Sequence, residues 1–270
     1  MMDKERVAAH FSRAAKEYDA YACVQKKMAH RLLAMAKEKG PFDKILEIGC
    51  GTGFLTKLLA EEFPKAEIQA IDISLEMLET AKLKLADYPA VSFRLADGEY
   101  LAGGSYDLII SNAVFQWFHD YRRAFRGMRK SLQQNGWLLY ATFGENTFHE
   151  LKWAFAEAYK ENKIHVHYEF GPQFRSIEEL TEYAQAEGFM GHHESTEHIE
   201  YFKSVEEFLH SVKKVGANNS AKADKVFTSR RLILSMLKHY EELQLKNGVV
   251  PATYHIIYGE AIQRIDKSIL

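Results

Sequence analysis

The nine residues Ile45-Leu46-Glu47-Ile48-Gly49-Cys50-Gly51-Thr52-Gly53 join a short apolar run to three glycines that alternate with other residues. Residues 44–48 are aliphatic and bounded by turn residues, which predicts a buried parallel strand, and residues 54–62 have helical periodicity. Glycine permits positive φ and lets a ligand approach the backbone without meeting a Cβ. The stretch therefore predicts a strand, a loop that touches a ligand, and a helix.

Three kinds of ligand compete for such a loop: a nucleoside triphosphate, a dinucleotide and S-adenosylmethionine. A phosphate-binding loop needs Lys and then Ser or Thr after its last glycine, and Phe54-Leu55 stands there instead. A dinucleotide loop spaces its glycines G-x-G-x-x-G, whereas this loop reads G-x-G-x-G with Glu47 two residues ahead. The spacing favours the sulfonium cofactor.

Strands alternate with helices over residues 44–143, which predicts an α/β, doubly wound, Rossmann-like sheet of mostly parallel strands. In such a sheet ligands lie beyond the carboxyl ends of the strands, and Glu47, Asp72, Asp97 and Asn112 fall at or just past such ends. The predicted strands are 44–48, 66–71, 91–95, 106–110 and 137–143, and the helices are 54–62, 75–85 and 121–132.

Two acidic residues suit particular parts of a nucleoside. Asp72 comes roughly 20 residues after the loop, where a carboxylate accepts hydrogen bonds from ribose hydroxyls. Asp97, at the end of the next strand, can accept a hydrogen bond from the exocyclic amine of adenine.

The pattern changes after residue 144 to aromatic-rich helices, at 148–162, 177–187, 205–215 and 229–242. A strand at about 192–202 and an alternating last strand at 252–259 complete the sheet. We read residues 145–175 and 204–248 as insertions above one sheet. The predicted organisation is an N-terminal helical lid (1–40), a cofactor-binding core (41–144), substrate-covering insertions (145–248) and a last antiparallel strand with the C-terminus (249–270).

Composition narrows the class of protein. A formal net charge of -2 argues against a nucleic-acid binder that works by bulk attraction. No long apolar run or signal sequence indicates a membrane or secretion, so the cytoplasm is expected. Two cysteines are too few for a disulfide framework, and the twelve histidines show no metal-ligand spacing, so no metal is expected.

The core residues resemble the class I S-adenosylmethionine-dependent methyltransferases, through residues 46–53, Asp72, Asp97-Gly98 and Ser111-Asn112. The resemblance implies a seven-stranded sheet whose last strand is antiparallel. The flanking segments resemble more narrowly the malonyl-acyl-carrier-protein O-methyltransferases of biotin synthesis. These segments are residues 11–19 with Tyr21 and Gln25, then 111–117, 142–144, 215–218 and 251–255.

This resemblance implies transfer of a methyl group from S-adenosylmethionine to the free carboxylate of malonyl-acyl-carrier protein. The malonyl methyl ester would start the synthesis of the pimeloyl precursor of biotin. The expected partner is acyl carrier protein. The expected cofactor-binding residues are Glu47, Gly49, Gly51, Gly53, Asp72, Ile73, Met77, Asp97, Gly98, Asn112, Tyr18 and Gln25.

The chemistry requires positioning more than proton transfer. Methyl transfer from a sulfonium is an in-line displacement, and a malonyl carboxylate is ionised at pH 7 because carboxylic acids titrate near about 4. No catalytic acid or base is therefore expected, and the contribution of the chain is alignment. Donors that could hold the acceptor carboxylate are Tyr18, Tyr21, Gln116, Trp117 and Arg175.

A heptad stripe marks the N-terminal segment. Phe11, Tyr18, Gln25 and Leu32 recur every seven residues, and Tyr21 shares their face if the segment is one helix. We expect Phe11 and Leu32 to pack on the core. Tyr18 and Gln25 have polar tips, which favours a lid over the cofactor.

Basic residues crowd the predicted helix at 121–132, namely Arg122, Arg123, Arg126, Arg129 and Lys130. A solvated helix face is the simpler explanation. Acyl carrier proteins are strongly acidic, however, and a basic face beside the pocket would steer them toward it. The same alternatives apply to Arg230-Arg231 and to Lys213-Lys214. The residues expected to dock the carrier are Arg122, Arg123, Arg126, Lys213 and Lys214.

Two other functions stay open on the sequence. One is methylation of a small molecule, such as a quinone precursor or a free carboxylic acid like aconitate. The other is a non-catalytic module that binds S-adenosylmethionine. Dependence of turnover on the carrier protein separates the first from the expected function, and any turnover excludes the second.

Overall fold

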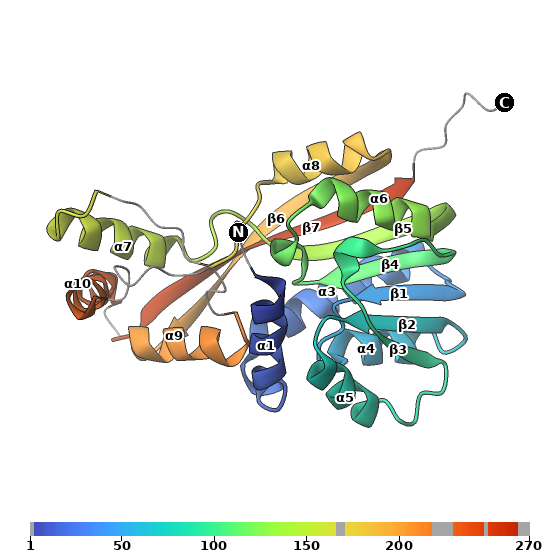
Figure 1. Ribbon diagram of the computed structural model, residues 1–270, viewed down its shortest axis with the longest axis horizontal. Coiled ribbons are helices and arrows are strands. Elements are labelled where there is room, and N and C mark those ends of the chain that lie inside the picture. The colour runs from blue at the N-terminus through green and yellow to red at the C-terminus, as the bar shows by residue number, and fades with distance from the viewer. Residues whose placement is uncertain (1–2, 166–170, 218–228, 246–247, 264–270) are drawn as a thin grey trace.

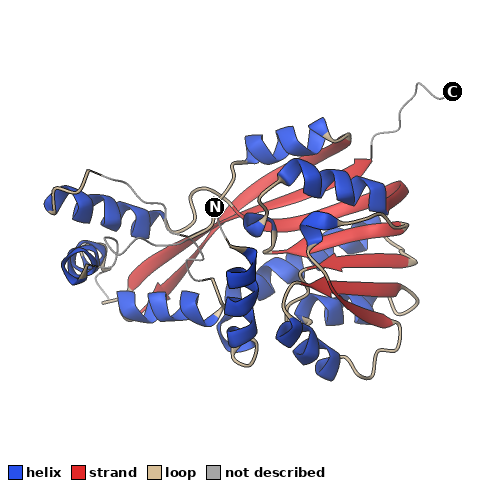
Figure 2. Ribbon diagram, in the orientation of Figure 1, coloured by secondary structure: helices blue, strands red, loops and turns tan. Residues whose placement is uncertain are grey.

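The computed structural model describes residues 3–165, 171–217, 229–245 and 248–263. They contain one seven-stranded sheet (Figures 1 and 2), so the predicted α/β, mostly parallel sheet is confirmed. The strands are β1 (Lys44–Ile48), β2 (Glu67–Asp72), β3 (Val91–Leu95), β4 (Tyr106–Asn112), β5 (Leu132–Phe143), β6 (Phe189–Phe202) and β7 (Val250–Gln263).

The strand order is β3-β2-β1-β4-β5-β7-β6, and β7 is antiparallel to both of its neighbours. Because β1 lies between β2 and β4, the direction in which the chain winds reverses beside β1. Ligands of doubly wound sheets bind in the crevice at this switch point. The glycine loop follows β1, so the topology places it there.

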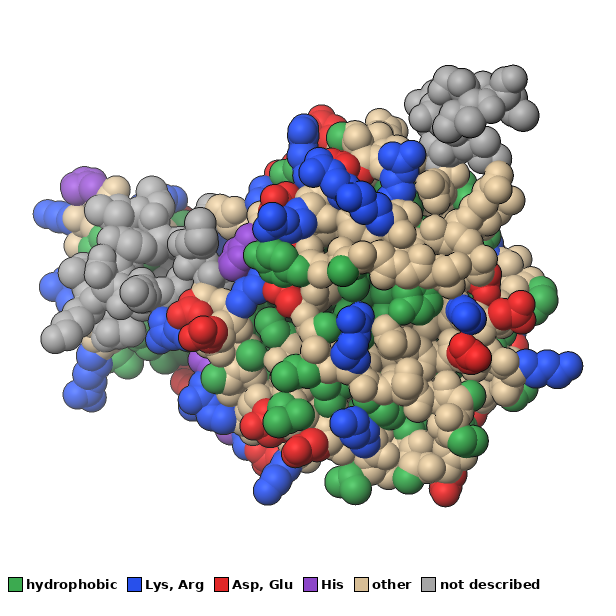
Figure 3. Space-filling model, turned by 45° about the vertical axis from the view of Figure 1, so that its right-hand side comes forward, with side chains coloured by type: hydrophobic (Ala, Val, Ile, Leu, Met, Phe, Trp, Pro, Cys, Tyr) green, Lys and Arg blue, Asp and Glu red, His purple; other side chains and the backbone are tan. Residues whose placement is uncertain are grey.

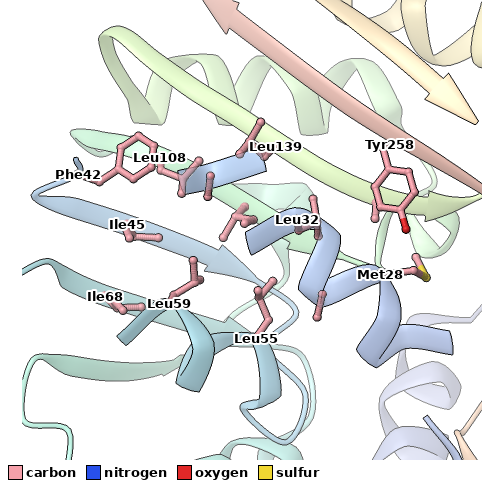
Figure 4. Packing of buried hydrophobic residues seen from close by; sticks show 14 of the residues in the cluster. Met28, Leu32, Phe42, Ile45, Leu55, Leu59, Ile68, Leu108, Leu139 and Tyr258 are labelled. Carbon is pink, nitrogen blue, oxygen red and sulfur yellow. The ribbon is translucent and has the colours of Figure 1, made fainter. Parts of the chain in front are cut away.

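Helices cover both faces of the sheet (Figure 1). One face is covered by α3 and α4, whose apolar side chains pack on β1, β2 and β4 in the main core (Figure 4). The opposite face is covered by α6 and α8. The bounds are α3 (Cys23–Lys39), α4 (Phe54–Glu62), α5 (Leu75–Lys84), α6 (Tyr121–Ser131) and α8 (Ile177–Ala186), with the short 3₁₀ turns η1 (Gly98–Tyr100) and η2 (Phe115–Trp117).

A third apolar cluster lies away from the main sheet. Helices α7 (His149–Glu161), α9 (Val205–Lys214) and α10 (Arg230–Glu241) pack around the far ends of β6 and β7 (Figure 1). This region corresponds to the expected insertions. Asn218, which contributed to the resemblance, lies outside the described residues. No helix in the described part of the chain is long and apolar enough to cross a membrane.

The N-terminal segment differs from a single helix. It forms α1 (Lys4–Ala14), α2 (Tyr18–Tyr21) and α3, so the heptad stripe does not run along one helix face. The third helix belongs to the main core, because Met28, Leu32 and Ala36 are fully buried there. Within the described part of the N-terminal segment, α1 and α2 therefore remain as the predicted lid.

Strand β5 begins five residues before the predicted strand at 137. Tyr106 pairs with Leu132, whereas Leu108 pairs with Trp137, so the intervening residues of β5 bulge out of the ladder. Asn135 has φ +64° in this bulge. The dipeptide Asn135-Gly136 is typical of turns, and here it lies in the bulge that interrupts β5.

Candidate active site

The glycine loop is hydrogen-bonded to the second strand, β2. The backbone N–H groups of Gly49 and Cys50 both donate to the carbonyl oxygen of Ile71, at 2.7 and 3.0 Å. Gly51 has φ +53°, and a Cβ built on it would have no atom within 4 Å. The backbone of Gly51 therefore faces open space, as a ligand-binding loop requires.

Gly53 has a role in packing. It caps the start of α4 at φ +84°, and a Cβ there would meet Leu85 at 2.6 Å and Ala81 at 3.1 Å. It lines neither of the two cavities described below. The expected contact between Gly53 and the cofactor stays a prediction; the glycine is also required by packing, because α4 approaches α5 closely here.

Two adjoining cavities lie at the carboxyl ends of the strands, with volumes of about 680 and 390 Å³. Both are lined by Tyr18, Gly49, Gly51 and Asn112, so Tyr18 stands where they meet. The larger is also lined by Lys4, Val7, Phe11, Ile48, Asp72, Ile73, Met77, Ala96, Asp97, Gly98, Ala113, Val114, Trp117 and Phe118. The smaller is also lined by Asp19, Ala22, Gln25, Lys26, Glu47, Cys50, Thr52, Phe54 and Leu55.

Asp72 connects the two strand ends that border the larger cavity. Its Oδ2 accepts a hydrogen bond from Gly51 N at 2.8 Å, and its Oδ1 accepts one from Ser74 N at 2.8 Å. Burial raises the pKa of Asp72, whereas the backbone donors oppose this shift. Each carboxylate oxygen can accept a second hydrogen bond, so Asp72 can hold the loop and still receive a ligand hydroxyl.

Asp97 forms an ion pair with Lys4, which the sequence did not indicate as a site residue. Its Oδ2 accepts a hydrogen bond from Lys4 Nζ at 2.6 Å, and its Oδ1 accepts one from Glu99 N at 2.9 Å. Asp97 and Lys4 both line the larger cavity. An adenine amine at this carboxylate would therefore share it with an ammonium group.

The smaller cavity contains two buried acceptors without a partner. Glu47 Oε2 and Asn112 Oδ1 have no hydrogen-bond partner among the described residues. Asn112 Nδ2 donates to the backbone oxygen of Gln25 at 2.9 Å, which leaves its own oxygen for a ligand. Burial raises the pKa of Glu47 to about 8, and the negative charge of Asp72 acts in the same direction. Buried acceptors in a cavity suit a ligand that carries an ammonium group.

The expected acceptor-holding residues fall into two groups. Tyr18 and Trp117 line the larger cavity. The Trp117 side chain is 8% exposed and its Nε1 has no partner among the described residues. Burial and the negative charges of Asp72 and Asp19 raise the pKa of Tyr18, so its hydroxyl remains protonated. Both are neutral hydrogen-bond donors at the cavity wall.

The other three candidates make contacts outside these two cavities, and their expected role in holding the acceptor stays a prediction. Gln116 is buried, donates from Nε2 to Ala113 O at 2.7 Å and accepts from Thr142 Oγ1 at 2.9 Å. Tyr21 packs against His210, with 6.0 Å between ring centroids. Arg175 pairs with Glu179 at 2.8 Å. None of the three lines either cavity. The Gln116 amide and Arg175 Nη1 have partners within the fold, whereas Arg175 Nε has none among the described residues.

The basic residues of α6 are not equivalent. Arg122 and Arg123 are exposed, and the guanidinium of Arg123 lies 4.9 Å from the centroid of the exposed Tyr100 ring, which Lys4 also contacts. Arg126 makes two hydrogen bonds of 2.9 Å to Glu187. Figure 3 shows Lys and Arg side chains gathered over the region of α6 and α8. The start of α6 is thus the part of this face that borders the larger cavity.

The second basic pair lies apart from α6. Lys214 pairs with Glu17, and Lys213 is exposed on the same helix. Figure 1 shows α9 and α6 on different sides of α1. The two basic clusters therefore lie apart, and Arg126 and Lys214 already have carboxylate partners. Docking of the carrier at these residues stays a prediction.

Several cavity residues of the N-terminal segment are not among those predicted from the sequence. Lys4, Val7 and Phe11 recur at helical spacing on α1 and line the larger cavity. Phe11 was assigned to core packing, but it contacts Trp117 edge to face with 5.5 Å between ring centroids. The spacing of the three residues was visible in the sequence, but nothing in it indicated that this face meets the strand ends.

Comparisons with known proteins agree with this geometry. A family model described as a methyltransferase domain matches residues 46–140. A malonyl-[acyl-carrier protein] O-methyltransferase of Acetivibrio thermocellus is 44% identical over 96% of this chain and 93% of that protein. The protein of the same name from Anoxybacillus flavithermus is 42% identical over 96% of this chain and 97% of that protein.

Solved structures share the fold at low sequence identity. The YcgJ protein of Bacillus subtilis has a TM-score of 0.62 at 17% identity, over 88% of this chain and all of that one. A Haemonchus contortus phosphoethanolamine N-methyltransferase 2 in complex with S-adenosyl-L-methionine has a TM-score of 0.53 at 19% identity, over 87% of this chain and 53% of that one.

Proposed function

Because the chain belongs to the family of malonyl-[acyl-carrier protein] O-methyltransferases, we propose that it methylates the free carboxylate of a malonyl group carried by acyl carrier protein. The observation that carries the proposal is the end-to-end likeness to relatives of that name, which extends beyond the cofactor loop into the helices around it. The malonyl methyl ester would serve as the starting unit for a pimeloyl precursor of biotin.

The cofactor is S-adenosylmethionine, and the cavity residues fit its parts. Asp72 and Asp97 would receive the ribose hydroxyls and the adenine amine in the larger cavity. Glu47 Oε2 and Asn112 Oδ1, which have no partner among the described residues, would receive the α-ammonium group in the smaller one. Bound there, the cofactor supplies an electrophilic methyl group on a positively charged sulfur.

The chain itself contributes alignment and exclusion of water. The malonyl carboxylate is already an anion at neutral pH and attacks without a base, provided that it lies in line and within about 3.5 Å of the methyl group. Tyr18, Phe11 and Trp117 lie on the wall of the larger cavity, where their rings limit the access of water. In a drier cavity the attacking anion is less well solvated.

Trp117 Nε1 and the Tyr18 hydroxyl are the donors that we assign to the malonyl carboxylate. Both are neutral, whereas a guanidinium would form a strong charge-assisted pair with the anion. Such a pair would stabilise the carboxylate more than the transition state, in which its negative charge is being lost, and would slow the transfer. Neutral donors fix the position of the carboxylate with less of this cost.

The carrier protein would approach over the start of α6. Arg122 and Arg123 are exposed there, and Arg123 contacts Tyr100, whose ring is also contacted by the cavity residue Lys4. An acidic carrier would be steered by these charges, which act mainly on the rate of encounter. This placement keeps the malonyl arm close to the larger cavity.

The test is mass spectrometry of malonyl-acyl carrier protein after incubation with the chain and S-adenosylmethionine. The proposal predicts a mass increase of one methyl group that is removed by mild ester hydrolysis. Methylation of free malonate or aconitate at an equal rate would instead indicate a small-molecule enzyme. Cofactor binding without methylation of either substrate would indicate a non-catalytic module.

A further inference from the structure

Helix α1 forms one wall of the larger cavity and is held at both of its ends. Lys4, Val7 and Phe11 face the cavity from successive turns of the helix. At the end of the helix, Ser12 Oγ and Ser74 Oγ lie 2.9 Å apart and share a hydrogen bond, and Ser74 caps α5. At its beginning, Lys4 reaches across to Asp97 and Glu99.

Lys4 sits in a site built to receive an ammonium group. Its Nζ is 2.6 Å from Asp97 Oδ2 and 2.5 Å from Glu99 Oε2, and it lies 5.1 Å from the centroid of the Tyr100 ring. Glu99 is 1% exposed. Two carboxylates and an aromatic ring around one cation, partly withdrawn from water, make a stronger contact than an exposed ion pair.

The buried Glu99 carboxylate also fixes the neighbouring turn. It accepts hydrogen bonds from His119 N at 2.9 Å and from Asp120 N at 3.1 Å, and Asp120 caps the start of α6. The partners of Lys4 are therefore tied to the turn η1 and to the start of α6. The two ion pairs join α1, which lines one wall of the cavity, to these elements.

We propose that Lys4 is a positioning residue of the cofactor site. Lys4 anchors α1 over the cavity through its ion pairs with Asp97 and Glu99, and these ion pairs must break before the cofactor can leave. Val7 and Phe11 line the larger cavity, and the proposal requires that α1 moves away from a cofactor bound there when the cofactor is exchanged. Breaking the anchor lowers the barrier to that movement. The inference depends on the proposed function only for the identity of the cofactor.

The experiment measures release of S-adenosylhomocysteine, the demethylated cofactor, by displacement in a stopped-flow instrument. Lys4→Met should release it about tenfold faster than wild type, as expected for loss of a partly buried charge-assisted contact. Lys4→Arg, which keeps the charge, should stay close to wild type. Lys16→Met, at an exposed lysine between α1 and α2, is the matched control and should not change release.

Hydrogen exchange of α1 in the complex with S-adenosylhomocysteine provides the second measurement. In Lys4→Met the amides of α1 should exchange faster, whereas those of β1 and β4 should not change. Release within twofold of wild type would overturn the proposal. Faster release with unchanged exchange in α1 would also overturn it, because Lys4 would then act on the cofactor directly. A chain that binds S-adenosylhomocysteine but does not methylate malonyl-acyl carrier protein would refute the proposed function and leave this test intact.

Discussion

Asp72 Oδ2 accepts a hydrogen bond from the backbone N–H of Gly51 at 2.8 Å, so the acid at the end of β2 holds the glycine loop that follows β1. The carboxylate expected to bind a ribose therefore also shapes the loop. Because the same side chain accepts from Ser74 N, it fixes the start of the segment that leads into α5. In the proposed site, one residue would thus couple loop geometry to cofactor recognition.

Replacement of Asp72 by Asn should weaken both roles. An amide cannot accept on both sides, so one buried backbone N–H would face an NH₂ group, at a cost of about 1–3 kcal/mol. We expect S-adenosylhomocysteine to bind at least roughly tenfold more weakly, and the melting temperature to fall. Calorimetric titration and thermal unfolding measure the two effects. Asp87→Asn, at an exposed carboxylate, should change neither.

Glu47 should make the free energy of unfolding of the apoprotein fall as the pH rises, which is the opposite of the usual effect of a carboxylate. Since burial raises its pKa to about 8 from an ordinary 4.5, the folded chain holds a proton that the unfolded chain loses between these pH values. This stabilising contribution is complete below the ordinary pKa and is lost as pH rises through about 8. Glu47→Gln should lack that part of the decline when denaturant unfolding is compared at about pH 5 and pH 8. Parallel pH profiles of the two proteins would contradict the prediction.

Binding of S-adenosylhomocysteine should also release protons near pH 7. A ligand ammonium beside Glu47 favours its ionised form and lowers its pKa. The binding enthalpy of wild type, measured by calorimetry in buffers of different ionisation enthalpy, should then vary with the buffer. Glu47→Gln should show much less variation, and equal variation would place the ammonium elsewhere.

Trp117→Phe should lower kcat/KM for malonyl-acyl carrier protein by about tenfold, since it removes one hydrogen-bond donor and keeps the ring contact with Phe11. The affinity for S-adenosylhomocysteine should stay within about twofold, because Trp117 is assigned to the acceptor. Arg175→Met should have a smaller effect on kcat/KM, as Arg175 lines neither cavity. A larger loss in Arg175→Met than in Trp117→Phe would reverse the assignment.

Tyr18→Phe should reduce the rate of methyl transfer more than Gln25→Ala does. The Tyr18 hydroxyl is assigned to the acceptor, whereas the contact of Gln25 with Asn112 uses the backbone oxygen, which the substitution retains. Single-turnover measurements with bound cofactor separate this effect from cofactor affinity. Unchanged rates in Tyr18→Phe would remove the hydroxyl from the site.

Reversal of charge at Arg122 and Arg123 together should raise KM for malonyl-acyl carrier protein by about tenfold at low salt, and by less at high salt. KM for a small malonyl thioester should be unaffected. Lys65→Glu is a suitable control, because this exposed lysine lies just before the amino end of β2, whereas the site lies at the carboxyl ends of the strands. An equal effect on both substrates would exclude docking at the start of α6.

The bounds of two elements show what local sequence pattern can predict. The strand at 44–48 and the helix at 54–62 agree with the structure at both ends, because each is a periodic run bounded by breakers. The bulge in β5 was less predictable. It depends on pairing with Tyr106 and Leu108, which are distant in sequence.

By itself, the sequence determined the doubly wound sheet, the glycine loop at its switch point and the acids at the strand ends, because these follow from local periodicity and from the rule that parallel strands end at one edge. Only the tertiary structure decided which side chains are available there. The Gln116 side-chain oxygen accepts a hydrogen bond from Thr142, whereas Trp117 Nε1 has no partner in the part of the chain that the structure describes. Lys4 meets Asp97 across 93 residues of sequence. Whether a hydrogen-bonding group already has a partner depends on which groups the fold places beside it. The spacing of residues along the sequence does not encode this.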